Sequence, residues 1–217
     1  MAIHLPVLHK KKNRAQKSAD HRMESEAALQ DYVSESHYPE HYEKKVITRT
    51  GVELFMRPIK PEDASLLLDL INSLSPKSKY YRFFTPLEVL PRHLLIRFTQ
   101  IDYNRDMALV ALDKTESEER MLAVARFISR PGQPDTEFAV VVRDEWQGKG
   151  VGRVLLENLI VFARDKKIES MNGYVLSENI HMLSLMRKLG FQLSKIPCED
   201  QYFVKIDLKS EAVNKIN

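Results

Sequence analysis

The order of apolar and polar residues divides the chain into three parts. Residues 1–43 have few periodic apolar positions, residues 44–208 carry closely spaced apolar runs, and residues 209–217 again lack a pattern. Apolar residues that alternate or form β-branched runs indicate strands, and those three and four apart indicate helices. We therefore predict a folded domain over 44–208, an N-terminal extension that is partly disordered or helical, and a C-terminal tail. The extension is interpreted as a poorly ordered leader in preference to a regulatory or docking arm.

Strand and helix patterns alternate within the predicted domain. The apolar stretches 46–48 and 52–58 flank the turn pair Thr50-Gly51, which predicts a hairpin. Further strands are predicted over 107–113, 120–129, 136–142, 171–176, 191–196 and 201–208. Helices are expected to begin near residues 61, 76, 91, 151 and 179. Central βαβα units with strands at both ends indicate a mixed sheet of the α/β class.

Composition narrows the class of protein. The net charge of +3 is too small to indicate a nucleic-acid partner, and no apolar run is long enough for a transmembrane helix. The N-terminus lacks the apolar core and cleavage site of a signal peptide. Cys198 is the single cysteine, which excludes a disulfide framework and favours a reducing compartment. We expect a cytoplasmic protein without a membrane or nucleic-acid partner and, since the seven histidines lack ligand spacing, without a metal.

The stretch from Glu137 to Gly152, EFAVVVRDEWQGKGVG, combines three features. A β-branched apolar run predicts a buried strand, a glycine-rich turn follows, and a helical pattern starts at Val151. The first N–H groups of a helix are unpaired and partly positive, and glycines let a ligand approach the backbone. Residues 147–152 therefore predict a phosphate or pyrophosphate site, with an ordinary glycine-rich turn as the alternative.

Two common phosphate-binding loops do not fit this turn. A P-loop needs Ser or Thr after its lysine, and Lys149 is followed by Gly150. A dinucleotide fingerprint beginning at Gly148 needs a glycine at its sixth position, where Arg153 stands. The remaining pattern, Gln-x-x-Gly-x-Gly from Gln147, resembles the acyl-CoA pyrophosphate loop of the GNAT superfamily of N-acetyltransferases.

A second segment strengthens this resemblance. Asn179 starts a predicted helix that ends in Lys-Leu-Gly-Phe at 188–191, similar to the last motif of that family. The resemblance extends over 44–208 and implies the GNAT fold. In that fold a mixed, mostly antiparallel sheet of six to seven strands is flanked by helices.

A narrower resemblance lies within the superfamily. The acetyltransferase domain of bacterial Pat-type protein lysine acetyltransferases is similar over the segments 59–63, 78–84, 99–103 and 137–142. That domain is often fused to an acyl-CoA-synthetase-like region or a cyclic-nucleotide-binding domain, neither of which fits in residues 1–43. The resemblance therefore implies a stand-alone version.

The reaction that the resemblance implies needs a base. An attacking amine must be neutral, whereas a lysine amine has an unperturbed pKa near 10.4, so a carboxylate has to accept its proton. Glu137 lies five residues, or roughly 17 Å of strand, before Val142. This span is comparable with the reach of pantetheine from pyrophosphate to thioester, and Pat-type enzymes use a glutamate at this position. We predict Glu137 as general base, the alternative being a strand-edge glutamate paired with a lysine.

The predicted acetyl-CoA site comprises three groups of residues. Pantetheine amides are expected to pair, as with an added strand, with the backbone of Val140, Val141 and Val142. The pyrophosphate is expected to contact Gln147, Gly148, Lys149, Gly150, Val151, Gly152 and Arg153. The CoA arm is expected to reach Asn179 and Met182. A plain helix N-cap is the alternative role of Asn179.

Other candidate residues have weaker support. Many GNAT enzymes place a tyrosine, as acid for the leaving thiolate, where this chain has Met186. A thiol of pKa near 8.5 needs little protonation, so this difference weakens the assignment only slightly. Covalent acyl transfer is disfavoured because Cys198 has no evident histidine partner. Structural roles are expected for Asp102, Tyr174 and Glu178.

We therefore predict an acetyl-CoA-dependent N-acetyltransferase that modifies a lysine amine of a protein. The resemblance implies a metabolic enzyme, such as an acyl-CoA synthetase, as acceptor. The alternatives are a GNAT enzyme acting on a small amine and a non-catalytic acyl-CoA sensor. The sequence leaves the oligomeric state and the acyl-chain preference open.

Overall fold

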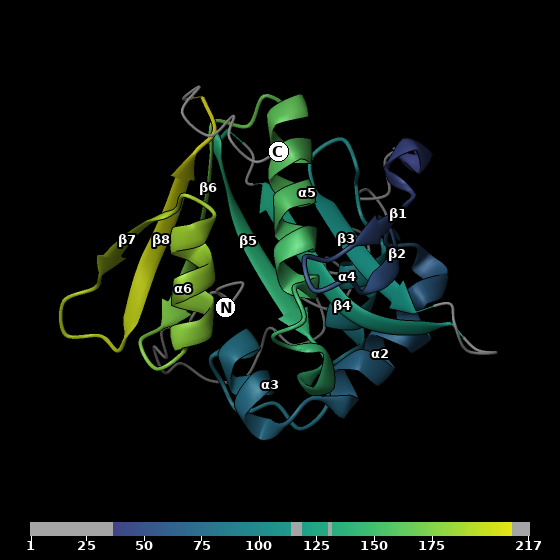
Figure 1. Ribbon diagram of the computed structural model, residues 1–217, viewed down its shortest axis with the longest axis horizontal. Helices are drawn as coiled ribbons and strands as arrows, with labels where there is room; N and C mark the ends of the chain where they lie inside the picture. The colour runs from purple at the N-terminus through teal and green to yellow at the C-terminus, as the bar shows by residue number, and fades with distance from the viewer. Residues whose placement is uncertain (1–36, 114–118, 130–131, 210–217) are drawn as a thin grey trace, which may run out of the picture.

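One eight-stranded sheet forms the centre of the molecule (Figure 1). The computed structural model describes residues 37–113, 119–129 and 132–209, so most of the predicted extension and tail lies outside the described residues. The spatial order is β1-β2-β3-β4-β5-β6-β8-β7. The strands are β1 Lys44–Ile47, β2 Glu53–Pro58, β3 Met107–Asp113, β4 Arg120–Ser129, β5 Asp135–Val142, β6 Ser170–Leu176, β7 Gln192–Lys195 and β8 Gln201–Asp207.

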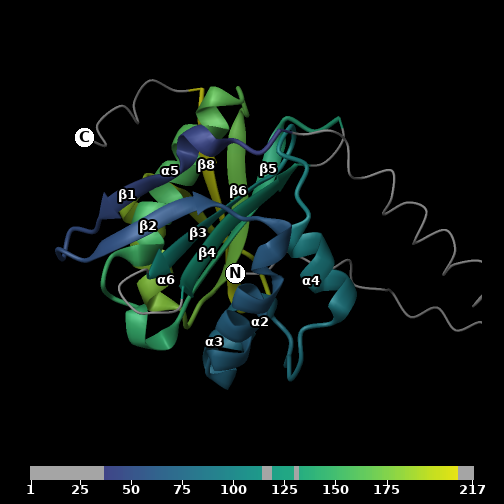
Figure 2. The same ribbon diagram turned by 90° about the vertical axis from the view of Figure 1, so that its right-hand side faces the viewer.

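Helices cover both faces of the sheet, as the view in Figure 2 shows. Helices α5 and α6 lie on one side, and α2, α3 and α4 lie on the other. Their bounds are α2 Ala64–Ser73, α3 Pro76–Phe83, α4 Arg92–Thr99, α5 Val151–Asp165 and α6 Ile180–Lys188. Three short 3₁₀ turns are η1 Glu40–Tyr42, η2 Pro61–Asp63 and η3 Asp144–Trp146. Within the described ranges, no helix is long and apolar enough to cross a membrane.

The predicted elements are confirmed, and the expected number of strands is too low. Strands β3 and β4 begin and end at the predicted residues, and the helix expected from 151 begins at Val151. The sheet has eight strands, as many as the stretches predicted along the chain, whereas the family resemblance implied six to seven; the four-residue edge strands β1 and β7 both pair with their neighbours. Gly190, with φ of +86°, follows α6 in the left-handed conformation that its position after the helix predicts.

Alternating residues of the central strands feed two hydrophobic cores. Leu109 and Ala111 of β3 pack in the core that includes α5, whereas Ala108 and Val110 pack in the core that includes α2 and α4. Side chains of a strand point to opposite faces in turn, so a fully buried sheet needs apolar residues at successive positions. This requirement explains why β3 is a continuous apolar run with only its last residue partly exposed.

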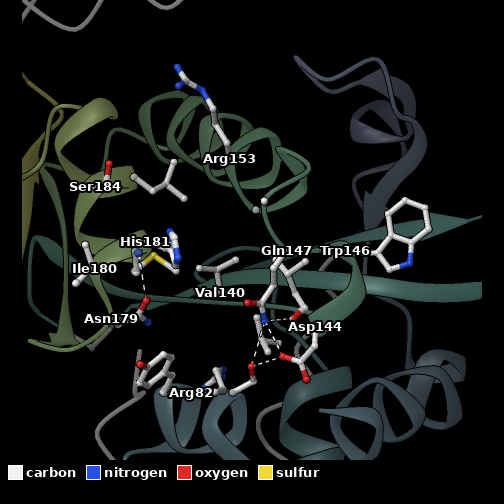
Figure 3. A pocket seen from close by; sticks show the side chains of 18 of the residues that line it. Arg82, Val140, Asp144, Trp146, Gln147, Arg153, Asn179, Ile180, His181 and Ser184 are labelled. Carbon is white, nitrogen blue, oxygen red and sulfur yellow. Dashed lines mark hydrogen bonds between the residues drawn. The ribbon is translucent and has the colours of Figure 1, made fainter. Parts of the chain in front are cut away.

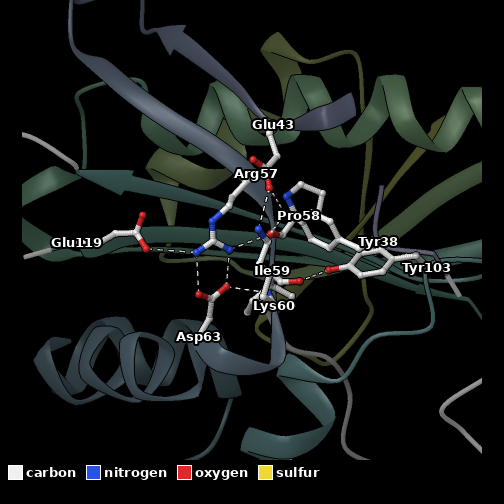
Figure 4. Close-up of polar contacts among 9 residues, drawn as sticks. All are labelled: Tyr38, Glu43, Arg57, Pro58, Ile59, Lys60, Asp63, Tyr103 and Glu119. Carbon is white, nitrogen blue, oxygen red and sulfur yellow. Dashed lines mark hydrogen bonds and ion pairs between the residues drawn. The ribbon is translucent and has the colours of Figure 1, made fainter. Parts of the chain in front are cut away.

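A buried ion pair joins β2 to the turn before α2 (Figure 4). The guanidinium of Arg57 donates to both carboxylate oxygens of Asp63, at 2.6 and 2.8 Å. Asp63 also accepts the Lys60 backbone N–H at 2.7 Å, and Glu119 lies 3.4 Å from Arg57. The cluster therefore satisfies its buried charges with one another and holds the first helix to the sheet.

Candidate active site

The sheet opens into a cleft where β5 and β6 diverge. These two strands are parallel, and they pair only over Asp135–Ser170, Thr136–Met171 and Glu137–Asn172. Strand β5 continues beside β4 as far as Val142. The β5 edge from 138 to 142 therefore has no strand beside it in the part of the chain that the structure describes, so its backbone groups can pair with an extended ligand.

This cleft has a volume of about 890 Å³ and is lined by four parts of the chain (Figure 3). One wall is the free edge of β5, and the glycine-rich turn closes one end. Helices α3 and α6 supply the remaining sides. Of the residues predicted for acetyl-CoA, the lining includes Val140, Val141, Val142, Gln147, Gly148, Gly150, Gly152, Arg153, Asn179 and Met182. The predicted residues outside the lining are Glu137, Lys149 and Val151.

The glycine-rich turn adopts a conformation that favours glycine. Gly148 and Gly150 have φ of +75° and +84°, and Gly150 is the residue directly before α5. A Cβ on Gly150 would lie 3.2 Å from the Cβ of Thr48, and one on Gly152 would lie 3.2 Å from a methyl of Val142. The start of α5 can thus sit close to β5, with its first backbone N–H groups at the cleft.

The two cationic residues of the turn differ in where their charges lie. The ammonium of Lys149 stacks over the ring of Trp146, 4.7 Å from its centroid. Arg153 lines the cleft while its Nε donates to Glu157 at 2.8 Å, one helical turn later. Arg153 therefore offers charge to the cleft, whereas Lys149 would have to leave Trp146 to do so.

Gln147 and Asp144 connect the turn to helix α3. The Gln147 amide nitrogen donates to Asp144 at 2.9 Å and lies 3.1 Å from the Ser78 hydroxyl and 3.2 Å from the Val142 carbonyl. Partial burial acts to raise the pKa of Asp144, but hydrogen bonds from Ser78, Ser75 and Gln147 outweigh it and lower the pKa. The Gln147 side chain thus faces α3 instead of the amino end of α5.

Asn179 caps α6, and the helix presents its first turn to the cleft. The Asn179 side-chain oxygen accepts the Met182 backbone N–H at 3.2 Å. This is the N-cap arrangement that the sequence offered as an alternative. The side-chain amide group is a donor that the cap does not use, and both residues line the cleft.

Glu137 is the last residue of β5 that pairs with β6, and it is 8% exposed. The side chain is close enough to Arg82 of α3 to oppose part of the effect of burial, which lowers the pKa of Arg82 to about 10. Arg82 itself lines the cleft and is 4% exposed. Arg82 thus lies between the cleft and a carboxylate that is outside the cleft lining, directly before the free edge of β5.

Sequence reasoning assigned no role to several residues that the structure places at the cleft. Ser78, Tyr81 and Arg82 project from α3, and Tyr81 lies with its hydroxyl 3.4 Å from the Glu178 carbonyl. Two sequence features could have pointed to α3. Residues 78–84 belong to the Pat-type resemblance, and a serine stands at the N-cap of the helix, where Ser75 accepts the Ser78 backbone N–H.

The weaker candidates lie as follows. Glu178 lines the cleft, whereas Met186 is fully buried in the core. Tyr174 packs against Phe203 with ring centroids 5.5 Å apart. Asp102 accepts the Asn104 backbone N–H at 3.0 Å, and Cys198 is exposed. Among the described residues, no group of three histidine, cysteine or carboxylate side chains could hold a metal.

Comparison with known proteins gives consistent results. The family model described as the acetyltransferase (GNAT) family matches residues 75–191. An acetyltransferase of Pseudomonas aeruginosa is 32% identical over 141 residues, which are 65% of this chain and 76% of that protein. The acetyltransferase Pat of Mycolicibacterium smegmatis is 32% identical over 147 residues, which are 67% of this chain and 43% of that longer protein. The crystal structure of the GNAT domain of S. lividans PAT has a TM-score of 0.72 and 28% identity, covering 79% of this chain and 99% of that one.

Proposed function

The chain belongs to the acetyltransferase (GNAT) family, and we propose that it moves an acetyl group from acetyl-CoA to a lysine amine of a protein, with Glu137 as general base. The observation that carries this proposal is the free edge of β5. That edge covers residues 138–142, with the glycine-rich turn beside Val142 at one end and Glu137, outside the cleft lining, directly before the other end. A pantetheine arm laid along it would carry its thioester toward the carboxylate.

The phosphate end would hold the donor through backbone groups. The first N–H groups of α5 are unpaired within the helix and form a positive dipole end, which suits a pyrophosphate. Arg153 adds a side-chain cation, and the valines from Val140 to Val142 offer N–H and C=O groups to the pantetheine amides. A backbone N–H of this edge can also polarise the thioester carbonyl.

The acyl end would carry out the proton transfer. As the amine attacks the thioester carbonyl carbon, its proton passes to Glu137, directly or through one water. Collapse of the tetrahedral intermediate breaks the carbon–sulfur bond and releases the thiolate of CoA. The thiol of CoA has a pKa near 8.5, so its thiolate is a good leaving group. The reaction therefore does not need an acid at the position where this chain has the fully buried Met186.

A protein acceptor is supported by the similarity to two Pat proteins. The experiment incubates the purified protein with acetyl-CoA and several acyl-CoA synthetases, and acetyl-lysine is measured by mass spectrometry. We expect acetylation of specific lysines, which the Glu137→Gln variant produces about 100-fold more slowly. Transfer only to small amines in a parallel panel of polyamines and amino acids would reassign the acceptor class. Acetyl-CoA binding with no transfer in either panel would instead favour the sensor.

A further inference from the structure

Asp144 connects the glycine-rich turn that follows it to helix α3, which lies more than 60 residues earlier in the sequence. It is the first residue of η3, directly after β5 and Arg143. Its carboxylate accepts the Ser75 backbone N–H at 2.6 Å and the Gln147 amide at 2.9 Å, and it also accepts the Ser78 hydroxyl. One carboxylate therefore binds the first turn of α3 and the first residue of the glycine-rich turn (Figure 3).

Gln147 completes a closed polar unit between the two walls. Its amide contacts Ser78 as well as Asp144, so the two side chains bridge from the glycine-rich turn to α3 directly and through the carboxylate. Because the hydrogen bonds lower the pKa of Asp144, the carboxylate is charged at neutral pH. Charge-assisted hydrogen bonds are stronger than neutral ones, which makes this connection stiff.

Helix α3 then carries the connection along the cleft. The helix has eight residues, so it is roughly 12 Å long. Ser78 lies in its first turn, and Arg82 lies four residues later on the same face. Arg82 is the side chain whose charge interacts with Glu137. One short helix thus has its beginning at the proposed phosphate end and its last turn at the proposed acyl end.

We propose that Asp144, Ser78 and Gln147 form a coupling unit through which CoA bound at the glycine-rich turn fixes α3 and so places Arg82 beside Glu137. This inference rests on the proposed function. Asp144 and Ser78 are positioning residues in it, because they act through α3. A ligand that holds the turn in one conformation also holds the Gln147 side chain, and the binding free energy is thereby shared with α3.

Hydrogen–deuterium exchange with and without CoA tests the coupling directly. In the wild type we expect CoA to slow exchange both at the start of α5, residues 151–156, and over α3, residues 76–83. In Asp144→Asn and in Ser78→Ala, the slowing should persist in α5 and fall by at least half in α3. The matched control is Asp165→Asn, because that carboxylate also accepts a hydroxyl, from Tyr42 at 2.9 Å, but lies at the far end of α5. It should leave both effects unchanged.

Kinetics with the best acceptor provide a second measurement. We expect kcat to fall about tenfold in Asp144→Asn, with KM for acetyl-CoA within about threefold of wild type, since the loss is in positioning and not in donor binding. If Asp144 served only folding, Asp144→Asn would change Tm without lowering kcat selectively over KM for acetyl-CoA. Equal CoA protection of α3 in the wild type and in both variants overturns the coupling. An absence of CoA protection in α5 of the wild type overturns the proposed function itself, and the two failures are thereby distinguished.

Discussion

Two buried arginines on the same face of the sheet have opposite environments. Arg57 on β2 pairs with Val110, and Arg126 on β4 pairs with Ala108, so both point toward the layer of α2, α3 and α4. They are 6% and 2% exposed. Burial acts to lower the pKa of Arg57, but its hydrogen bonds and charge interaction with Asp63 raise it overall. For Arg126, burial and, after it, the neighbouring charge of Arg82 lower the pKa to about 9.

The hydrogen bonds of Arg57 and Arg126 differ as their pKa values do. Arg57 reaches two carboxylates, whereas Arg126 donates from one nitrogen to the Phe98 carbonyl and stacks on that ring, 4.4 Å from its centroid. Its Nε and Nη1 find no partner among the residues that the structure describes. A buried group with unmet hydrogen bonds weakens the fold and calls for an explanation other than stability. The comparison separates a charge cluster that holds the protein together from one that adjoins the proposed catalytic carboxylate.

The largest expected effect tests this separation directly. Arg57→Met should destabilise the protein by about 3–5 kcal/mol, because it leaves the Asp63 carboxylate buried without its partner. Arg126→Met should change stability by less than about 1 kcal/mol, because it removes a desolvated charge with two nitrogens that no described residue satisfies. Urea unfolding followed by circular dichroism measures both.

A double variant controls for the change in side-chain shape. Arg57→Met with Asp63→Leu removes both charges and should recover part of the loss. If Arg57→Met and Arg126→Met proved equally damaging, the distinction between the two clusters would be wrong.

The second effect concerns the carboxylate beside Arg82. Glu137→Gln should lower turnover about 100-fold, since general acid–base catalysis contributes at least that factor. Affinity for CoA should stay within about threefold, because the glycine-rich turn is unchanged. Steady-state assays and calorimetry with CoA make the two measurements.

Asp135→Asn is the matched control for that variant. Asp135 is on the same strand and accepts the Asn172 amide at 2.7 Å. It should keep most of the activity. Wild-type turnover by Glu137→Gln would show that the carboxylate belongs with Arg57 and Asp63 as a structural group.

The third prediction tests whether the conformation of the glycine-rich turn is needed for CoA binding or only for folding. Gly150→Ala should lower CoA affinity about tenfold, because a Cβ at positive φ is strained and this one would also press on Thr48. Gly132→Ala introduces a Cβ at φ of +73° with nothing within 4 Å, so it carries the same local strain away from the cleft. Both variants should lose stability, Gly150→Ala the more because of the contact with Thr48, and calorimetry should find weakened CoA binding in Gly150→Ala alone. Equal affinities would leave the turn as an ordinary βα connection.

The sequence predicted the parts of this site that depend on local order along the chain. The start of α5 at Val151 follows from an apolar pattern that begins directly after glycines. The separation of β5 from β6 could not be predicted, because it depends on how two segments joined by a whole helix pair. The same holds for Asp144, whose partners Ser75 and Ser78 are 69 and 66 residues earlier. The lack of hydrogen-bond partners for Nε and Nη1 of Arg126 among the described residues is likewise a property of packing, which a lone arginine inside an apolar strand pattern does not reveal.

The smallest effect concerns Asn179, which serves both the fold and the proposed site. Its side-chain oxygen caps α6, and its amide group lies at the cleft. Asn179→Ala should cost about 1 kcal/mol of stability through loss of the cap, and CoA affinity should fall about fivefold through loss of one hydrogen bond. Asn179→Asp keeps an oxygen for the Met182 N–H but removes the amide donor, so it should retain the stability and still lose the affinity. Thermal unfolding and calorimetry on the same samples separate the two contributions. If Asn179→Asp bound CoA as tightly as the wild type, Asn179 would be a cap alone and would belong with the residues that serve only the fold.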